Sequence, residues 1–280
     1  MRVSESCAKC LYDRQKAKCG DDAYLALVRK IIEEREENDT SPLLVYRFSQ
    51  AYEELSGRPR TGYADVKRHY NDLMLGMESR LLSRIESSAD PVMTALAFAR
   101  AANYIDYGAM DHVSEDECLA LLEKAALRAE ERNTYGRLMQ ELADARRFLL
   151  IADNCGEIVL DKLFLEQLRK RFSQLRLQVL VRGGEVLNDA TLPDAEYVGI
   201  NHFAEIISNG QAVAGTIYSL MPEDARDALD RADVILAKGQ GNYESLSGQG
   251  RHVYYAFLCK CDLFTDRFSV PPLTGMLVEE

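Results

Sequence analysis

A short apolar run that ends in polar residues is the feature of this sequence that most constrains its fold. The run covers Phe148–Ala152, Asp153 and Asn154 follow it directly, and Gly156 and Glu157 open a helical pattern. A run of this length with polar and glycine boundaries predicts a strand that is buried on both faces. In an open α/β sheet, ligands bind just beyond the carboxyl ends of such strands. An acid and an amide at that point are hard oxygen donors that suit Mg²⁺ or Mn²⁺.

From about residue 146 onward, short apolar runs alternate with amphipathic helices. Strands are predicted over Phe148–Ala152, Leu177–Val181, Tyr197–Ile200, Val234–Ala237 and Val253–Leu258, with weaker signals at Glu205–Ser208 and Gly215–Leu220. Helices are predicted over about Glu157–Phe172 and Pro222–Arg231. Strands that alternate with helices predict a mostly parallel sheet covered on both faces. We therefore expect an α/β domain over residues 146–280, built as a three-layer α/β/α Rossmann-like sandwich.

Residues 1–145 predict helices only. Apolar side chains recur at helical spacing, for example at Tyr70, Leu73, Met74 and Met77. Helix starts are indicated by Asp90 before Pro91 and by a capping box of Ser114 with Glu117. These apolar stripes are typical of a core, and this half shows no catalytic pattern. We expect an all-helical N-terminal domain that precedes the α/β domain.

The charge of the chain limits its partners. Its 280 residues carry a formal net charge of −11, which argues against nucleic acid or an anionic membrane as the main partner. No apolar run approaches the roughly 20 residues that span a bilayer, and the N-terminus lacks the apolar region of a signal peptide. The sequence therefore predicts a cytoplasmic protein with no membrane contact.

The cysteines allow two interpretations. There are seven, an odd number, which argues for thiols or metal ligands rather than a disulfide framework. Cys7, Cys10, Cys259 and Cys261 together offer four thiolates, a candidate tetrahedral Zn²⁺ site that would join the two termini. The alternative is ordinary thiols, because a CxxC and a CxC about 250 residues apart are not a standard zinc spacing.

Further polar side chains follow the other predicted strands. They are Arg182, Asn188 and Asp189 after the second strand, Lys238, Gln240, Asn242 and Glu244 after Val234–Ala237, and Lys260 after the last strand. Such strand ends lie along one edge of a doubly wound sheet, so these groups are expected to share one pocket. Single segments of this kind are also typical of helix caps and turns.

The chemical types of these side chains fit a phosphate ester and a metal. Asp153, Asn154 and Asp189 form an incomplete oxygen shell that leaves room for water and a phosphate oxygen. Lys238 and Lys260 are expected to neutralise the charge of the phosphoryl group. Either an aspartate attacks phosphorus, with Asp153 preferred and Asp189 as its rival, or a metal-bound water does.

These segments together resemble the damage-control phosphatase family, whose shared unit is the ARMT-like metal-binding domain, formerly the domain of unknown function 89. The similar segments are DNCGE at 153–157, RGGEVLNDAT at 182–191, ISNG at 207–210 and KGQGNYE at 238–244. Their order and spacing are similar across roughly the last half of the chain. Cys7 and Cys10 followed by Gln15, together with Lys260 and Cys261, resemble its cysteine-bearing microbial subfamily.

The resemblance implies a metal-dependent phosphatase that acts on damaged or surplus phosphometabolites, including sugar phosphates. It implies that Asp153, Asn154 and Asp189 bind a divalent metal, which in the family is Mn²⁺, Co²⁺, Ni²⁺ or Mg²⁺. It also implies a set of substrate contacts: Glu157, Gln240, Asn242, Glu244 and Lys260. The fold it implies, a helical part beside an α/β/α sandwich, agrees with the pattern of the residues.

Two other classes of function stay open. A methyltransferase or another nucleotide-cofactor enzyme on a Rossmann-like sheet requires a glycine-rich loop after the first strand, where this chain has DNCGE. A non-catalytic metal-dependent binding protein would bind phosphometabolites without releasing phosphate. Turnover distinguishes the binding protein from the phosphatase.

Overall fold

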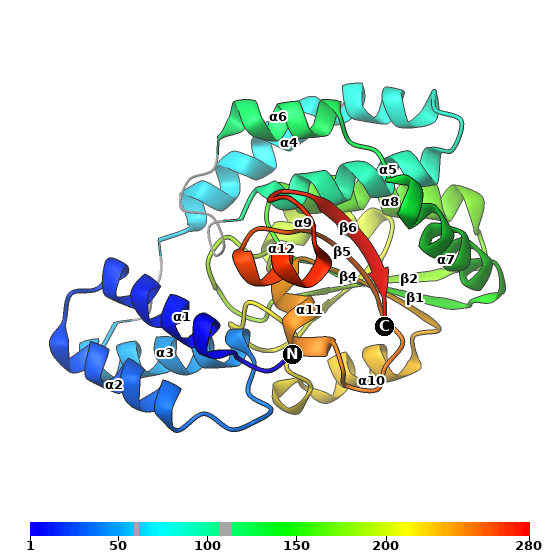
Figure 1. Ribbon diagram of the computed structural model, residues 1–280. Helices are drawn as coiled ribbons and strands as arrows, with labels where there is room; N and C mark the ends of the chain where they lie inside the picture. The colour runs from blue at the N-terminus through cyan, green and yellow to red at the C-terminus, as the bar shows by residue number, and fades with distance from the viewer. Residues whose placement is uncertain (59–61, 107–113) are drawn as a thin grey trace.

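A six-stranded sheet forms the centre of the molecule, in the order β3-β2-β1-β4-β5-β6 (Figure 1). The structure is a computed structural model that describes residues 1–58, 62–106 and 114–280. The strands are β1 (Arg147–Ile151), β2 (Arg176–Val181), β3 (Glu205–Ser208), β4 (Val234–Lys238), β5 (Tyr254–Leu258) and β6 (Gly275–Glu279). The pairs from β3 to β5 are parallel, and β6 is antiparallel to β5. The predicted mostly parallel α/β sheet is confirmed.

Helices cover both faces of this sheet. The N-terminal half contains α1 (Glu5–Lys18), α2 (Asp22–Glu33), α3 (Ser41–Ser56), α4 (Ala64–Glu86), α5 (Pro91–Ala101), α6 (Glu115–Glu123) and α7 (Arg132–Asp144). The C-terminal half contains α8 (Glu157–Arg171), α9 (Leu192–Tyr197), α10 (Glu223–Arg231), α11 (Gln240–Leu246) and α12 (Asp262–Phe268). Among the described residues, we find no helix whose length and hydropathy would let it cross a bilayer.

The alternation of side chains along β1 explains the layers. Phe148 and Leu150 pack in an apolar cluster with α5 and α8, whereas Leu149 and Ile151 pack in a second cluster with α10 and α11. All four side chains are fully buried. Burial of one apolar side chain stabilises the folded state by about 1.5–3 kcal/mol. The apolar run that predicts β1 therefore also holds this strand between two layers of helices.

The helical half does not form one separate unit. Helices α4 and α5 share the large apolar cluster with α8 and the sheet. Helices α1, α2 and α3 have a small core of their own, and Figure 1 shows them together to one side of the sheet. The boundary at residue 145 stays a prediction, but the packing favours a division after α3.

Two predicted strands are wrong. Tyr197–Ile200 lies where α9 ends and a 3₁₀ turn over Ile200–His202 begins, because a capping box of Thr191 with Asp194 starts a helix there. Gly215–Leu220 contains a 3₁₀ turn over Tyr218–Leu220 instead of a strand. The sequence analysis also missed β6. This strand is antiparallel to β5 and follows α12, but its apolar run covers only residues 276–278, which is a weak strand signal.

The predicted helix starts are partly confirmed. The Asp90 side chain accepts a hydrogen bond from the Met93 amide, as expected of a cap. Ser114 likewise accepts from the Glu117 amide. The Glu117 carboxylate, however, accepts from the hydroxyl of Tyr104. The 3₁₀ turn over Ala102–Tyr104 is therefore tied to the start of α6.

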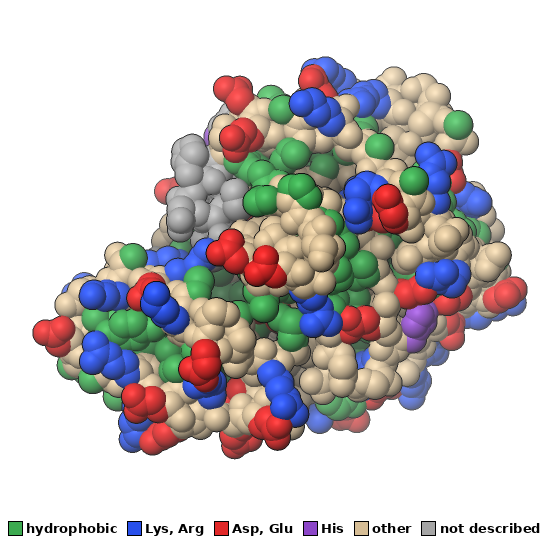
Figure 2. Space-filling model, viewed as in Figure 1, with side chains coloured by type: hydrophobic (Ala, Val, Ile, Leu, Met, Phe, Trp, Pro, Cys, Tyr) green, Lys and Arg blue, Asp and Glu red, His purple; other side chains and the backbone are tan. Residues whose placement is uncertain are grey.

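Both charge signs are spread over the surface. On the face shown in Figure 2, Lys and Arg side chains are interspersed with Asp and Glu side chains. The net charge of −11 is thus distributed rather than concentrated on this face. Local pairs, such as the exposed contact between Lys170 and Glu166, account for part of this mixture.

Candidate active site

The turn after β1 places Asp153 and Asn154 at the end of the strand. Gly156 has a φ of 81°, a conformation that favours glycine, and it is the N-cap of α8. A Cβ at this position would lie 2.9 Å from both Tyr70 and Ile105. The Gly156 amide donates to the Asn71 side chain over 2.6 Å. The DNCGE segment therefore folds into a tight turn that only glycine fits at this point.

The loop after β2 brings Asp189 beside Asp153. The Ala190 amide donates to the Asp153 carbonyl over 2.7 Å, and the Cys155 amide donates to the Asn188 carbonyl over 2.8 Å. Asn154 and Asp189 form an antiparallel bridge. Two aspartates that are far apart in the sequence thus meet at one edge of the sheet, as the sequence predicted.

Arg182 joins the two aspartates. Its Nη2 donates to Asp153 Oδ1 over 3.1 Å, and its Nε donates to Asp189 Oδ2 over 2.7 Å. Its Nη1 donates to Asn242 Oδ1 over 3.0 Å. The guanidinium is buried, with 1% of the side chain exposed. The sequence placed Arg182 at a strand end but assigned it no role. Asn242 is fully buried and is not among the residues that line the cavity, so its contact with substrate stays a prediction.

Beneath Asp153 lies a layer of buried amides. The side-chain amide groups of Asn103 and Asn154 donate to Asp153 Oδ2 over 3.0 and 2.8 Å. The same two groups donate to Glu157 Oε2 over 2.9 and 3.0 Å. Asn103 comes from the helical half, where the sequence showed no catalytic pattern. The structure therefore places Glu157, predicted to contact substrate, one layer below Asp153.

Lys238 is a buried counter-ion. Its Nζ donates to Glu157 Oε1 over 2.5 Å, to Asp161 Oδ1 over 2.8 Å and to the Ala99 carbonyl over 3.0 Å. Lys238 is the last residue of β4 and points to the same face of the sheet as Leu236, toward α5 and α8. This geometry differs from the prediction that Lys238 meets the phosphoryl group, because the side chain follows the alternation of the strand instead of leaving its end.

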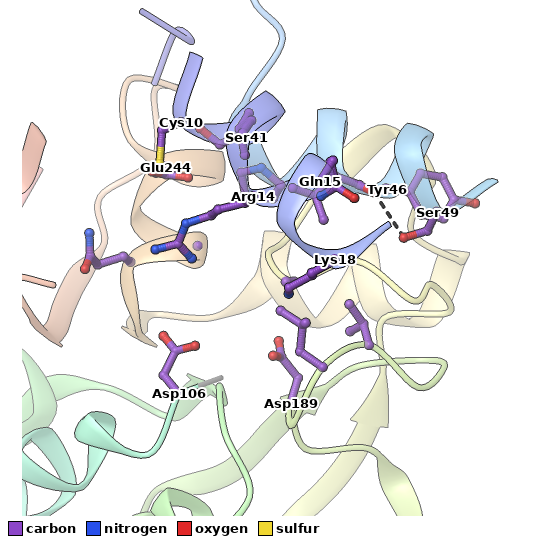
Figure 3. A pocket seen from close by; sticks show the side chains of 18 of the residues that line it. Cys10, Arg14, Gln15, Lys18, Ser41, Tyr46, Ser49, Asp106, Asp189 and Glu244 are labelled. Carbon is purple, nitrogen blue, oxygen red and sulfur yellow. Dashed lines mark hydrogen bonds between the residues drawn. The ribbon is translucent and has the colours of Figure 1, made fainter. Parts of the chain in front are cut away.

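Both aspartates line a cavity of about 1090 Å³, which Figure 3 shows above Asp189. Five predicted site residues line it: Asp153, Asp189, Gln240, Glu244 and Lys260. Asp106, which the sequence analysis missed, also lines it. The opposite wall comes from α1 and α3 (Figure 3). The cavity thus lies between the strand ends and the small helical unit.

Gln240 fixes the position of Lys260. The Lys260 amide donates to Gln240 Oε1 over 2.8 Å, and the Lys260 Nζ donates to Asp106 Oδ2 over 2.7 Å. Burial raises the pKa of Glu244 to about 7, although a hydrogen bond with Ser41 opposes that rise. The strand-end side of the cavity therefore has one lysine that is paired with Asp106, and the carboxyl group of Glu244, whose pKa is raised by burial.

The electrostatics of the two aspartates favour a cation. Burial, followed by the charges of Asp189 and Glu157, raises the pKa of Asp153 well above its usual range. Burial raises the pKa of Asp189 to about 6, against the opposing effect of Arg182. The positive charge of Arg182 therefore does not fully offset the burial of these two carboxylates and the repulsion from neighbouring carboxylates.

A count of the charges agrees with this conclusion. The carboxylates Asp106, Asp153, Glu157, Asp161 and Asp189 are joined to the cations Arg182, Lys238 and Lys260. In their ionised forms the carboxylates exceed the cations by two charges, which one divalent ion would balance. Among the described residues, no three His, Cys, Asp or Glu side chains form a ready-made metal cage. Asp153 and Asp189, which line the cavity, fit a metal that takes its other ligands from solvent or substrate. Asn154 is buried and is not among the lining residues, so its contact with the metal stays a prediction.

The predicted zinc site has no support from this geometry. Cys7, Cys10 and Cys261 line the cavity, whereas Cys259 is fully buried. Within residues 1–58, 62–106 and 114–280, these thiols do not form a cluster that could hold a metal, and the seven cysteines are free thiols. Zinc at this place stays a prediction from the sequence.

Gly239 is expected to be essential for the fold of the site. Its φ is 79°, and a Cβ at this position would fall on the Asp153 carboxylate. Gly239→Ala is expected to lower the free energy of unfolding by about 1–3 kcal/mol, the usual strain of such a backbone position. Gly136→Ala in α7 is the control, because a Cβ there meets no atom within 4 Å. Gly136→Ala is expected to raise the free energy of unfolding by up to about 1 kcal/mol, because alanine favours a helix more than glycine does. Urea denaturation measures both, and a stable Gly239→Ala protein would contradict the close approach.

Comparisons with known proteins agree with this arrangement. A family model described as the damage-control phosphatase ARMT1-like domain matches residues 3–272. A protein of Archaeoglobus fulgidus named damage-control phosphatase is 30% identical over 274 residues, which cover 94% of this chain and 93% of that protein. A protein of Pyrococcus horikoshii with the same name is 32% identical over 135 residues, 48% of this chain and 47% of that protein.

A solved structure shares the fold. The crystal structure of a DUF89 family protein from Pyrococcus horikoshii superposes with a TM-score of 0.78 at 21% identity, and 99% of each chain is covered. At this identity the likeness concerns the fold alone. It extends over the helical half as well as the sheet, so the helices that form the far wall of the cavity belong to the shared architecture.

Proposed function

Because the chain belongs to the damage-control phosphatase ARMT1-like family, we propose that this phosphatase depends on a divalent metal and hydrolyses small phosphorylated metabolites such as sugar phosphates. The main support for the proposal is the position of Asp153 and Asp189. The two carboxylates share the guanidinium of Arg182 and line the cavity. A bound Mn²⁺, Co²⁺, Ni²⁺ or Mg²⁺ would polarise the phosphoryl group and activate an oxygen nucleophile.

Arg182 holds this pair in position. One planar guanidinium donates to both carboxylates, so it sets their distance and orientation before any ligand arrives. The amides of Asn103 and Asn154 fix the second oxygen of Asp153. We propose that Asp153, Asp189 and the Asn154 carbonyl oxygen bind the metal, and that Asp153 and Asp189 are the candidates for a nucleophile.

Lys260 takes the role that the sequence had divided between two lysines. Both side chains are buried, but Lys260 lines the cavity and is bonded to Asp106, whereas Lys238 is bonded to Glu157 and Asp161 and is not among the lining residues. We propose that Lys260 binds a phosphate oxygen and stabilises the charge that develops during transfer. Gln240 fixes the backbone of Lys260 and borders the same space. Glu244 lines the same cavity, and we propose that it contacts the substrate.

The loop after β1 argues against a nucleotide-cofactor enzyme. A cofactor phosphate requires backbone amides in a glycine-rich loop, and here the Asp153 carboxylate occupies that place and lines the cavity. The binding-protein alternative differs from the proposal only in turnover, so it needs an experiment.

Phosphate release from p-nitrophenyl phosphate and a panel of sugar phosphates tests the proposal. The protein is first treated with a chelator, and the assay then contains no metal, Mn²⁺, Co²⁺, Ni²⁺ or Mg²⁺. We expect release to be lost on chelation and restored by at least one of these ions. Release that persists unchanged without metal would refute the metal dependence. Metal binding without release from any substrate would favour the binding protein.

A further inference from the structure

The cavity has a second basic region, on the wall opposite the two aspartates. Arg14 and Lys18 lie four residues apart on α1, so they share one face of that helix. Figure 3 shows both side chains pointing from α1 into the space above Asp106 and Asp189. Of the described Lys and Arg residues that line the cavity, these two come from α1 and only Lys260 comes from the strand ends. The cations of the cavity are therefore divided between two opposite walls.

Helix α1 is held firmly enough to present these side chains. The Tyr24 hydroxyl of α2 donates to Gln15 Oε1 over 2.7 Å, and both residues are buried. Leu11 and Tyr12 pack against the core of α2 and α3. On α3, the Tyr46 hydroxyl donates to Gln211 Oε1 of the α/β part over 3.1 Å. A chain of contacts thus fixes α1 relative to the strand ends.

Helix α3 adds polar groups to the lining of the cavity, beside apolar side chains such as Pro42 and Val45. The polar groups are the hydroxyls of Ser41, Tyr46 and Ser49 and the amide of Gln50. The Gln50 amide donates to the Tyr46 hydroxyl over 3.2 Å. These hydroxyl and amide groups can form hydrogen bonds with the hydroxyls of a polyhydroxylated molecule.

We infer that Arg14 and Lys18 bind a second oxyanion of the substrate, at the end remote from the phosphate that is removed. The inference rests on the proposed function, which places the reacting phosphate at Asp153, Asp189 and Lys260. A metabolite that reaches from those residues to α1 presents its far end to both cations. The substrate class is a phosphorylated sugar or polyol that carries a second phosphate or a carboxylate.

The location of the two cations supports a remote group over the reacting one. The reacting phosphate already has Lys260 at the strand ends. Arg14 and Lys18 lie across the cavity from Asp189, on an element that contributes no residue to the strand ends (Figure 3). The cavity of about 1090 Å³ is slightly larger than ordinary ligand pockets, which hold about 300–1,000 Å³, so it accommodates a whole sugar phosphate between the two walls.

A matched pair of substrates tests this inference. The same hexose is supplied as its monophosphate and as its bisphosphate, and kcat and KM are measured for the wild type, Arg14→Gln, Lys18→Gln and the double variant. For the bisphosphate we expect KM to rise about tenfold in each single variant, because each loses one charge-assisted hydrogen bond, while kcat stays within about twofold. For the monophosphate we expect little change. Lys16→Gln is the control, since Lys16 lies on α1, is exposed and does not line the cavity.

The outcomes separate this inference from the phosphatase proposal. Equal losses on both substrates would assign the two cations to the reacting phosphate and would overturn the inference. Unchanged kinetics in the double variant would overturn it as well. Calorimetry with the hexose bisphosphate in metal-free buffer gives an independent readout of binding to Arg14 and Lys18. If no phosphate is released from any substrate, the proposed function fails, whereas weaker calorimetric binding in the double variant still supports the second anion site.

Discussion

Replacing Asp153 with Asn is expected to lower kcat/KM for phosphate release by about a thousandfold or more, because the change removes a proposed metal ligand and metal catalysis contributes several kcal/mol. The side chain keeps its shape, and the amides that contact Asp153 come from neighbouring elements that remain in place. The loss should appear with each activating metal. Steady-state phosphate release measures it.

The stability of Asp153→Asn serves as its control. The folded-state pKa of Asp153 is raised above its ordinary value of 3.8, so the ionised carboxylate destabilises the metal-free fold above that pH. At pH 7.5 the metal-free variant should therefore be at least as stable as the wild type. The difference should narrow as the pH falls toward 4, where the wild-type carboxyl is protonated. A variant that unfolds, or that keeps its activity, would contradict the role of Asp153.

Replacing Lys238 with Met is expected to lower the free energy of unfolding by about 3–5 kcal/mol, since it leaves buried carboxylates without their cation. The Lys238 side chain has no exposed surface, and it is bonded to Glu157 and Asp161. The Ala99 carbonyl would also lose its donor. Urea denaturation of the metal-free protein measures the change.

Lys170→Met is the matched control for Lys238→Met. Lys170 pairs with Glu86 and Glu166, but half of its side chain is exposed. A surface pair contributes about 0–1 kcal/mol, so this variant should remain close to the wild type. A Lys238→Met protein with unchanged stability and no phosphate release would instead restore the catalytic role that the sequence suggested for Lys238.

The strand ends were predictable because they depend on local patterns. Asp153 follows an apolar run, and Asp189 follows Arg182 and two glycines after the next strand. A parallel sheet brings such ends to one edge, so the pair could be predicted without any contact. The direction in which a side chain points at a strand end could not be predicted in the same way. Lys238 points into the core beside Asp161, and every residue of β4 is buried, so the local pattern does not show which face Lys238 joins.

The contributions of the helical half could not be predicted because they depend on tertiary packing. Asn103 and Asp106 lie at the end of an apolar helix and have no ligand-like spacing. Only the packing of α5 on α8 brings Asn103 within 3.0 Å of Asp153 Oδ2. Arg14 and Lys18 look like ordinary charges on a surface helix until α1 is placed across the cavity. These residues become recognisable only when the helices are assembled around the sheet.

The position of the metal tests the central claim most directly. Crystals of the wild type grown with Mn²⁺ would be examined for anomalous scattering at a wavelength where manganese contributes strongly. The account predicts one strong peak bound by carboxylate oxygens of Asp153 and Asp189, which line the same cavity as Lys260. A peak at the cysteines, or no peak between the two aspartates in protein that releases phosphate with Mn²⁺, would contradict it.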